Sequence, residues 1–144
     1  MYPEEVVQPM REELTSIGFR ELRTPDEVDS ILKRAEGTAL VVVNSICGCA
    51  AGKARPAVAL ALSRQPRPDT LCTVFAGQDR EATEAARKHF TGYPPSSPSI
   101  GILRDGQLVY MMQRSDIEAS SPEMIASALA QAFEKHCAKE AISQ

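Results

Sequence analysis

The run Ala39–Val43 constrains the fold most, because its aliphatic side chains show none of the polar alternation of a half-exposed strand. Such a β-branched run is typical of a central strand that is buried on both faces. A second buried run, Thr70–Ala76, follows the alanine-rich helical segment 50–65, in which Pro56 should cause a kink or a new start. Two strands joined by a helix pair in parallel through a right-handed crossover. The chain is therefore expected to form an α/β sheet covered by helices on both faces.

An amphipathic helix is expected ahead of this sheet. Met10, Leu14 and Ile17 have the i, i+4, i+7 spacing of one helical face. Pro9 should lie in the first turn of this helix or break it in two. The N-terminal helical extension is therefore expected to cover residues 1–18.

Helix-start and turn signals divide the remainder of the chain. Thr24 and Glu27 have the spacing of a capping box, and Asp105-Gly106 is a strong signal for a hairpin turn. In chain order, the expected elements are an edge strand at 19–22, a helix from Thr24 to Gly37, a helix from Asp79 to Phe90, strands at 99–104 and 107–113, and a helix from Ser121 onward. Together with the two buried strands they predict a single domain over 1–144 with a central mixed sheet.

The composition argues against several classes of partner. The 144 residues carry a formal charge of −3 and no block of lysine or arginine, which disfavours nucleic acid as the main partner. The longest aliphatic run is far too short to span a membrane, and the acidic, amphipathic start MYPEEVVQPMREEL does not resemble a signal peptide. We therefore expect a cytoplasmic protein with no membrane partner. Its four cysteines would be kept reduced there, so a close pair points to redox or metal chemistry.

Cys47 and Cys49, separated only by Gly48, stand where the first central strand ends and a helix is expected to begin. Open α/β sheets place their functional sites at this end of their strands. Backbone N–H groups and the dipole of a helix N-terminus favour thiolate over thiol, so we expect a lowered pKa for Cys47. Lys53 and Arg55 add positive charge nearby. Cys47 should be the more exposed thiol, and the first helical turn should partly cover Cys49.

The spacing of the two cysteines also indicates the kind of redox chemistry. A disulfide across one residue closes a very small ring, which has little freedom to reach relaxed dihedral angles. Strained disulfides are more easily reduced, so this pair is expected to be a poor electron donor and better suited to thiol–disulfide exchange. Gly48 should allow backbone dihedrals that a side chain would resist.

A strand that ends in a close cysteine pair, a helix with a proline and a later Pro-Ser-Ile strand before a hairpin resemble the thioredoxin fold. Pro98 occupies the position of the cis-proline of that fold, opposite the cysteines. More closely, VVVNSICGCAAGKARP and HFTGYPPSSPSIGILRDGQLVYMMQRSDIE resemble the bacilliredoxin family, thioredoxin-like proteins with a CGC motif. The similarity includes the MYPEE start and the FEKHC segment near the end.

This resemblance implies removal of bacillithiol, a low-molecular-weight thiol, from proteins that carry it as a mixed disulfide, with disulfide isomerase activity also known in the family. By position, Cys47 would be the attacking thiolate, Cys49 the second thiol, and Pro98 the cis-proline that shapes the substrate groove. The implied partners are proteins with mixed disulfides, and a low-molecular-weight thiol or a reductase that recycles the pair. No cofactor is expected.

Other residues are expected near the thiols by their positions. Asn44 and Ser45 either donate hydrogen bonds near the thiolate or merely end the strand. Tyr93 and Ser97 are expected to line the groove beside Pro98. For Pro98, the alternative is an ordinary proline in a turn with a trans peptide bond.

Two alternatives to redox exchange follow from the same cysteines. Cys47 and Cys49 could bind zinc or copper together with His136 and Cys137. They could also be small, inert core residues. Core packing is the simpler interpretation of Cys72, which lies inside a buried strand, and of Cys137, which lies on the apolar face of the last helix.

Overall fold

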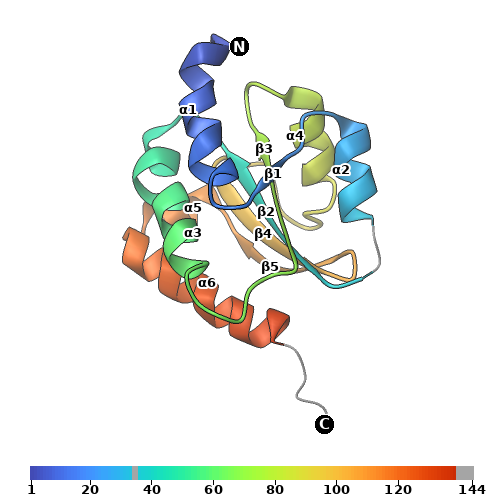
Figure 1. Ribbon diagram of the computed structural model, residues 1–144, viewed down its shortest axis with the longest axis vertical. Helices are drawn as coiled ribbons and strands as arrows, with labels where there is room; N and C mark the ends of the chain where they lie inside the picture. Colours follow the sequence, from blue (N-terminus) through green and yellow to red (C-terminus); the bar gives the residue numbers. More distant parts are fainter. Residues whose placement is uncertain (34–35, 139–144) are drawn as a thin grey trace.

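The strand β2 lies at the centre of a five-stranded sheet with the order β1-β3-β2-β4-β5 (Figure 1). The computed structural model describes residues 1–33 and 36–138. The strands are β1 (Arg20–Glu21), β2 (Thr38–Asn44), β3 (Thr70–Phe75), β4 (Ser99–Arg104) and β5 (Gln107–Met112). The helices are α1 (Glu4–Thr15), α2 (Pro25–Leu32), the π-helical turn η1 (Ala50–Ala54), α3 (Arg55–Ala61), α4 (Arg80–Arg87), α5 (Arg114–Glu118) and α6 (Pro122–Cys137).

The register of the sheet brings three chain segments together at one edge. β2 and β3 run parallel, with Asn44 opposite Phe75 at their carboxyl ends. β4 runs antiparallel to β2, so its first residue, Ser99, lies opposite Val43. The segments that follow β2 and β3 and the segment that precedes β4 therefore meet at the same end of the sheet, as the thioredoxin resemblance predicts.

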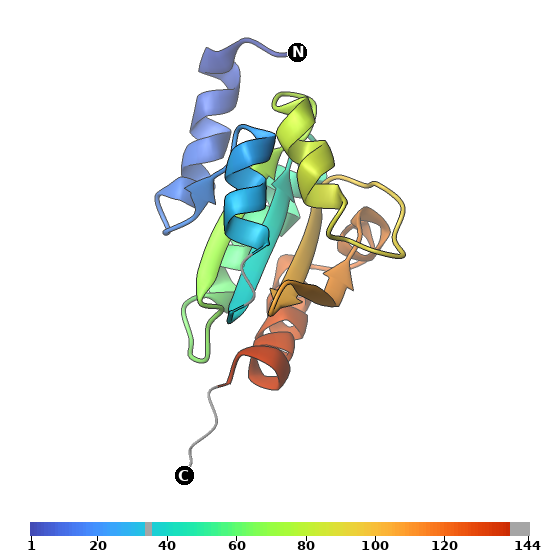
Figure 2. The same ribbon diagram turned by 90° about the vertical axis from the view of Figure 1, so that its right-hand side faces the viewer.

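Alternate residues of β2 supply two separate cores, which explains the unbroken aliphatic run. Leu40 and Val42 pack with residues of α3 and α6 on one face. Val41 and Val43 pack with residues of α2 and α4 on the other face. Figure 2 shows α2 and α4 together on this second face. The predicted α/β sheet with helices on both faces is confirmed.

α1 differs from the expected N-terminal helix. It begins at Glu4 and runs through Pro9 without interruption, so the expected first-turn or break position of that proline is wrong. Its buried face consists of Val7, Arg11 and Leu14. These residues have the same i, i+4, i+7 spacing as the predicted face but include a charged residue, which a hydrophobic pattern does not select.

Arg11 joins α1 to the sheet through buried charge. Its side chain is 1% exposed and donates hydrogen bonds to Glu4 at 2.8 Å, to Asp79 at 2.7 Å and to Glu21. The guanidinium also lies over the ring of Phe75, 5.2 Å from its centroid. Asp79 stands at the N-cap of α4, where the helix was expected to begin, but its carboxylate is bound to Arg11 and makes no capping hydrogen bond. The arginine therefore connects α1, β1 and the segment after β3.

The predicted helix starts and turns are confirmed, whereas two predicted helix ends are wrong. The capping box of Thr24 and Glu27 and the Asp105-Gly106 hairpin turn are both confirmed. α2 ends at Leu32 instead of Gly37, and residues 34–35 lie outside the described part. α4 ends at Arg87 instead of Phe90, and α5 was not predicted. In the described residues, no helix has the length and apolar character that a membrane crossing requires.

Replacement of Arg11 tests the buried charge network. Arg11→Met should lower the free energy of unfolding by about 3 kcal/mol, because Glu21 and Asp79 have little solvent and lose their buried cation, which leaves Asp79 only its 3.6 Å pair with Arg23. Urea denaturation measures this change. Lys33→Met is the control, since it removes an exposed pair with Asp29 and should change stability by less than about 0.5 kcal/mol. Similar losses in the two variants would contradict the assignment.

Candidate active site

The two close cysteines lie directly after β2, at the start of a helix. The N–H groups of Ala50 and Ala51 donate to the Cys47 carbonyl at 3.0 and 3.2 Å. Gly48 and Cys49 already have helical backbone and lead into η1. The expected position of Cys47 at a helix N-terminus is therefore confirmed.

The π-helical turn lets this helix continue past Pro56. A proline has no N–H to donate and crowds the preceding turn of an α-helix. Here the Arg55 N–H donates to the carbonyl of Ala50, which makes one wide turn before α3 begins. α3 begins at Arg55 with Pro56 in its first turn and runs to Ala61, which agrees with the expected new start at this proline, and Cys47 stands at the start of a longer run of helical peptide groups.

The environment of Cys47 favours its thiolate. Burial alone would raise the pKa of this thiol, but the Ser45 hydroxyl donates to its Sγ at 3.3 Å, and the N–H groups of Ala50 and Cys49 point to it. The positive charge of Arg114 acts in the same direction, and the net effect lowers the pKa of Cys47. The predicted direction is confirmed, with Arg114 as a source of charge that sequence analysis missed.

Ser45 is held in place by its neighbour Asn44. The Asn44 side chain accepts from the Ser45 N–H at 2.9 Å and donates to the Met10 carbonyl at 3.2 Å. Asn44 is 1% exposed, so its amide is turned into the protein and not toward a substrate. Of the two interpretations left open for this residue, the geometry favours a positioning role at the end of the strand.

A buried guanidinium completes this arrangement. Arg55 is 3% exposed and donates to the Asn44 side chain at 2.8 Å, to the Ser45 carbonyl at 2.9 Å and to Glu13 of α1 at 3.0 Å. The Arg55 guanidinium therefore binds these three residues and not the Cys47 thiolate. The sequence placed Arg55 near the site but gave no direction for its side chain.

Cys49 has the opposite environment. Its thiol donates to the Glu118 carboxylate, with 3.7 Å between Sγ and Oε2. Burial, the negative charge of Glu118 and the charge of a Cys47 thiolate all raise the pKa of Cys49. Both thiols are half-buried, so the expected greater exposure of Cys47 is not found. Cys49 packs partly against the core that α3 and α6 share, and its thiol also reaches the Glu118 carboxylate of α5.

α5 supplies both charges that face the thiols. Arg114 and Glu118 are four residues apart and form an ion pair at 3.4 Å. The Arg114 guanidinium also donates to the Ser97 carbonyl at 3.4 Å, and Lys53 donates to the Glu118 carbonyl at 2.7 Å. At the start of this short helix the Gln113 N–H donates to the Asp116 carboxylate at 2.9 Å, but Gln-x-x-Asp is not the Ser/Thr-x-x-Glu/Gln pattern that marks a capping box in a sequence.

A shallow groove of about 220 Å³ opens beside Cys47. It is lined by Tyr2, Ser45, Ile46, Cys47, Ala76, Gly77, Ser97 and Arg114. The predicted lining residue Ser97 is present, and the Ser97–Pro98 peptide bond is cis, as predicted. Tyr93 is 47% exposed and is not among the lining residues, so the structure does not bring it to this groove.

Tyr2 is a wall of this groove that sequence analysis did not select. Its N–H donates to the Gln78 side chain at 3.0 Å, and the Gln78 amide donates back to the Tyr2 carbonyl at 2.8 Å. These two bonds fix the residue ahead of α1 next to Gly77. The segment ahead of α1 therefore contributes directly to the surface around Cys47.

Gly48 does not need to be glycine in the dithiol form described. Its φ does not lie in the left-handed region, and a Cβ placed there would meet no atom within 4 Å. The expectation that this glycine provides unusual dihedrals is therefore wrong for this state.

The residues expected for a metal site are not brought together. Cys137 lies beside Thr38, the first residue of β2, whereas Cys49 follows the last. A strand of seven residues separates these ends by roughly 20 Å. Within residues 1–33 and 36–138, no group of three metal-ligating side chains occurs. The structure gives no support to the zinc or copper alternative.

The other two cysteines belong to the core, as expected. Cys72 is fully buried in β3, its thiol donates to the Leu40 carbonyl, and burial raises its pKa to about 12. Cys137 packs with Leu129 and Phe133 of α6. Burial raises the pKa of Cys137 as well. Neither thiol is suited to act as a nucleophile at neutral pH.

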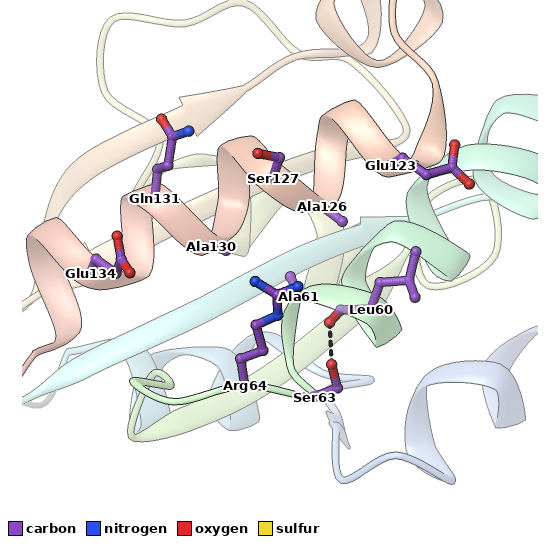
Figure 3. A pocket seen from close by; sticks show the side chains of 10 residues that line it. All are labelled: Leu60, Ala61, Ser63, Arg64, Glu123, Ala126, Ser127, Ala130, Gln131 and Glu134. Carbon is purple, nitrogen blue, oxygen red and sulfur yellow. Dashed lines mark hydrogen bonds between the residues drawn. The ribbon is translucent and has the colours of Figure 1, made fainter.

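A second groove, of about 490 Å³, lies between α3 and α6 (Figure 3). Its lining residues are Leu60, Ala61, Ser63, Arg64, Glu123, Ala126, Ser127, Ala130, Gln131 and Glu134. It contains no thiol, and its Ser63 hydroxyl is bound to the Leu60 carbonyl at 2.7 Å. The larger hollow is therefore separate from the cysteine chemistry.

Comparison with known proteins agrees with the geometry. The family model described as disulphide isomerase matches residues 2–137. A bacilliredoxin of Koribacter versatilis is 59% identical over 137 residues, which cover 95% of this chain and 94% of that protein. A bacilliredoxin of Geobacillus kaustophilus is 53% identical and covers 94% of each chain. This chain belongs to the bacilliredoxin family.

Solved thioredoxins share the fold of this bacilliredoxin-family chain. Mitochondrial thioredoxin 3 from Saccharomyces cerevisiae in its oxidised form has a TM-score of 0.57 at 15% identity, over 85% of this chain and 98% of that one. Thioredoxin from Fasciola hepatica has a TM-score of 0.56 at 18% identity, over 82% and 99% of the chains. The fold is thioredoxin-like, and the bacilliredoxin family places the chain among thiol–disulfide oxidoreductases.

Alkylation measures the predicted state of Cys47. In a Cys49→Ser background, the rate should rise with pH and level off below the pH at which a free thiol, with a pKa of about 8.5, would do so. Ser45→Ala and Arg114→Gln should each raise the pKa of Cys47, because they remove a hydrogen bond and a positive charge. Arg64→Gln, which removes the same charge from the groove between α3 and α6, should have no effect. A Cys47 midpoint at the free value would contradict this account.

Proposed function

We propose that this protein removes a low-molecular-weight thiol, such as bacillithiol, from protein cysteines that carry it as a mixed disulfide. The observation that carries the proposal is the difference between the two thiols. Cys47 is favoured as a thiolate at the edge of an open groove, whereas Cys49 is favoured as a protonated thiol. Such a pair can begin an exchange with one sulfur and keep the second sulfur in reserve.

The first step is attack by the Cys47 thiolate on the mixed disulfide. Its Sγ forms a bond to the sulfur of the low-molecular-weight thiol, the original disulfide breaks, and the substrate cysteine leaves as a thiolate. In the second step, the Cys49 thiolate attacks Cys47 Sγ and expels the low-molecular-weight thiolate. The pair is oxidised to a disulfide by two electrons, and an external thiol or a reductase returns it to the dithiol.

The groove supports a small anionic substrate group beside Cys47. Arg114 lies in its wall, and cysteine-derived thiols carry carboxylates that a guanidinium can bind through two hydrogen bonds. Ser97 is half-buried and lines the groove beside Cys47, which supports contact with the backbone of a substrate protein there. Ser97 and Pro98 therefore remain the proposed substrate-binding positions.

Disulfide isomerisation is a second activity that one observation favours. The raised pKa of Cys49 slows the step that would release Cys47 from a protein substrate. A longer-lived bond between Cys47 and the substrate gives another substrate thiol time to attack. The description of the matching family model agrees with this possibility.

Intact mass after incubation with a bacillithiol mixed disulfide tests the assignment of the two cysteines. Cys47→Ser should form no adduct, because it lacks the thiolate beside the groove. Cys49→Ser should accumulate one adduct on Cys47, because the second step is blocked. Cys137→Ser is the matched control, since it also removes one thiol but should behave as the unmodified protein.

Two results would contradict parts of this proposal, the roles of the two cysteines and the choice of bacillithiol. One is an adduct on Cys49 in the Cys47→Ser variant with catalysis intact, which would reverse the roles. The other is the absence of any adduct in Cys49→Ser while glutathione disulfide reacts readily, which would exclude bacillithiol as the substrate thiol.

A further inference from the structure

We infer that Glu118 is a catalytic base that accepts the proton of Cys49 when the mixed disulfide on Cys47 is resolved. This inference rests on the proposed function and assigns a residue that neither the CGC motif nor the cis-proline includes. It depends on one juxtaposition, that of the carboxylate at the end of α5 with the second thiol of the motif.

In the structure, the hydrogen bond between Cys49 and Glu118 already points from the proton donor to the proposed acceptor. Cys49 Sγ lies 3.7 Å from Glu118 Oε2, and the thiol is the donor. A base must lie within hydrogen-bond reach of the proton that it removes, and this contact satisfies that condition before any substrate is bound. The carboxylate is also half-exposed, so it can pass the proton on to water or to a leaving thiolate.

One further contact restrains the carboxylate of Glu118, and another restrains its backbone. Arg114 pairs with Glu118 at 3.4 Å. Lys53 donates to the Glu118 carbonyl at 2.7 Å, which joins the end of α5 to η1 directly after the cysteines. The ion pair with Arg114 therefore restrains the Glu118 side chain, and the Lys53 contact ties the backbone at the end of α5 to η1.

The second step requires such a base. The nucleophile in thiol–disulfide exchange is the thiolate, and Cys49 is held as a thiol in the dithiol form. In the proposed step, the Cys49 proton moves to Glu118 and the sulfur attacks Cys47 Sγ. The bond between Cys47 and the low-molecular-weight thiol breaks, and the leaving thiolate takes up a proton from Glu118 or water.

The first step of the reaction removes a negative charge beside Cys49, which makes the second step easier. The groups that face Cys49 are Glu118 and Arg114 of α5 and the neighbouring Cys47. Once Cys47 has formed the mixed disulfide, its negative charge is gone, and one cause of the raised pKa of Cys49 is removed. The attacking thiol thus becomes easier to ionise only after the first step.

A base and a mere negative neighbour have opposite effects on the rate. If Glu118 acted only through its charge, its neutralisation would lower the pKa of Cys49 and speed the second step. If it accepts the proton, neutralisation removes the acceptor and slows the step. Glu118→Gln, which keeps the size of the side chain, therefore distinguishes the two roles by the sign of the change.

Stopped-flow absorbance with one equivalent of dithiobis(nitrobenzoate) separates the steps. Cys47 releases the first coloured thiolate when it attacks the reagent, and Cys49 releases the second when it displaces the aromatic thiol from Cys47. At neutral pH, Glu118→Gln should keep the first phase and slow the second about a hundredfold or more, the range expected for loss of a general base. The deficit should shrink as pH rises, because hydroxide then replaces the missing base.

Two comparisons make the result specific. Glu123→Gln, which neutralises a carboxylate at the start of α6, should leave both phases unchanged. Acetate should restore the second phase of Glu118→Ala, because a free carboxylate can enter the space left by the side chain. A second phase in Glu118→Gln that is unchanged or faster would overturn the role of Glu118 alone. A wild-type protein with no first phase would overturn the proposed function itself.

Discussion

A buried guanidinium at the carboxyl end of β2 fixes the geometry on which the site depends. Arg55 has almost no contact with solvent, so its hydrogen bonds must be made within the protein, and they are made to Asn44, Ser45 and Glu13. These partners leave little freedom to the chain as it leaves the sheet. The Ser45 hydroxyl is thereby held under Cys47, where it can stabilise the thiolate.

The two thiols differ because α5 lies against them with its charges in a fixed order. Arg114 at its first position acts on Cys47, and Glu118 at its last position contacts Cys49. A short spacing between cysteines would otherwise give them similar surroundings. The asymmetry that an exchange reaction needs is therefore supplied by a segment almost 70 residues further along the chain, as the contact of Cys49 with Glu118 shows.

Patterns of apolar residues and local turns were sufficient to predict the sheet, its two covered faces and the place of the cysteines. The run Ala39–Val43 specified a central strand, and the family motifs specified the cis bond before Pro98. Buried arginines were not predictable in this way, because a hydrophobic pattern assigns Arg11 and Arg55 to the surface. α5 was missed because one turn and a half of helix has no periodicity to detect.

The groove residues show a further limit of sequence reasoning. Tyr93 was selected for its closeness to Pro98 along the chain, but its loop carries it outward. Tyr2 reaches the groove from the far end of the sequence, through contacts with Gln78 that no local pattern encodes.

The position of Tyr2 also decides how this protein should be handled. Any sequence fused ahead of Met1 emerges next to the groove at Cys47, where it can obstruct a bulky substrate or offer its own side chains to the thiolate. α6 ends at Cys137 beside Thr38, at the opposite end of β2 (Figure 1). Affinity tags, fluorophores and surface tethers are therefore better attached after α6, where they leave the approach to the cysteines open.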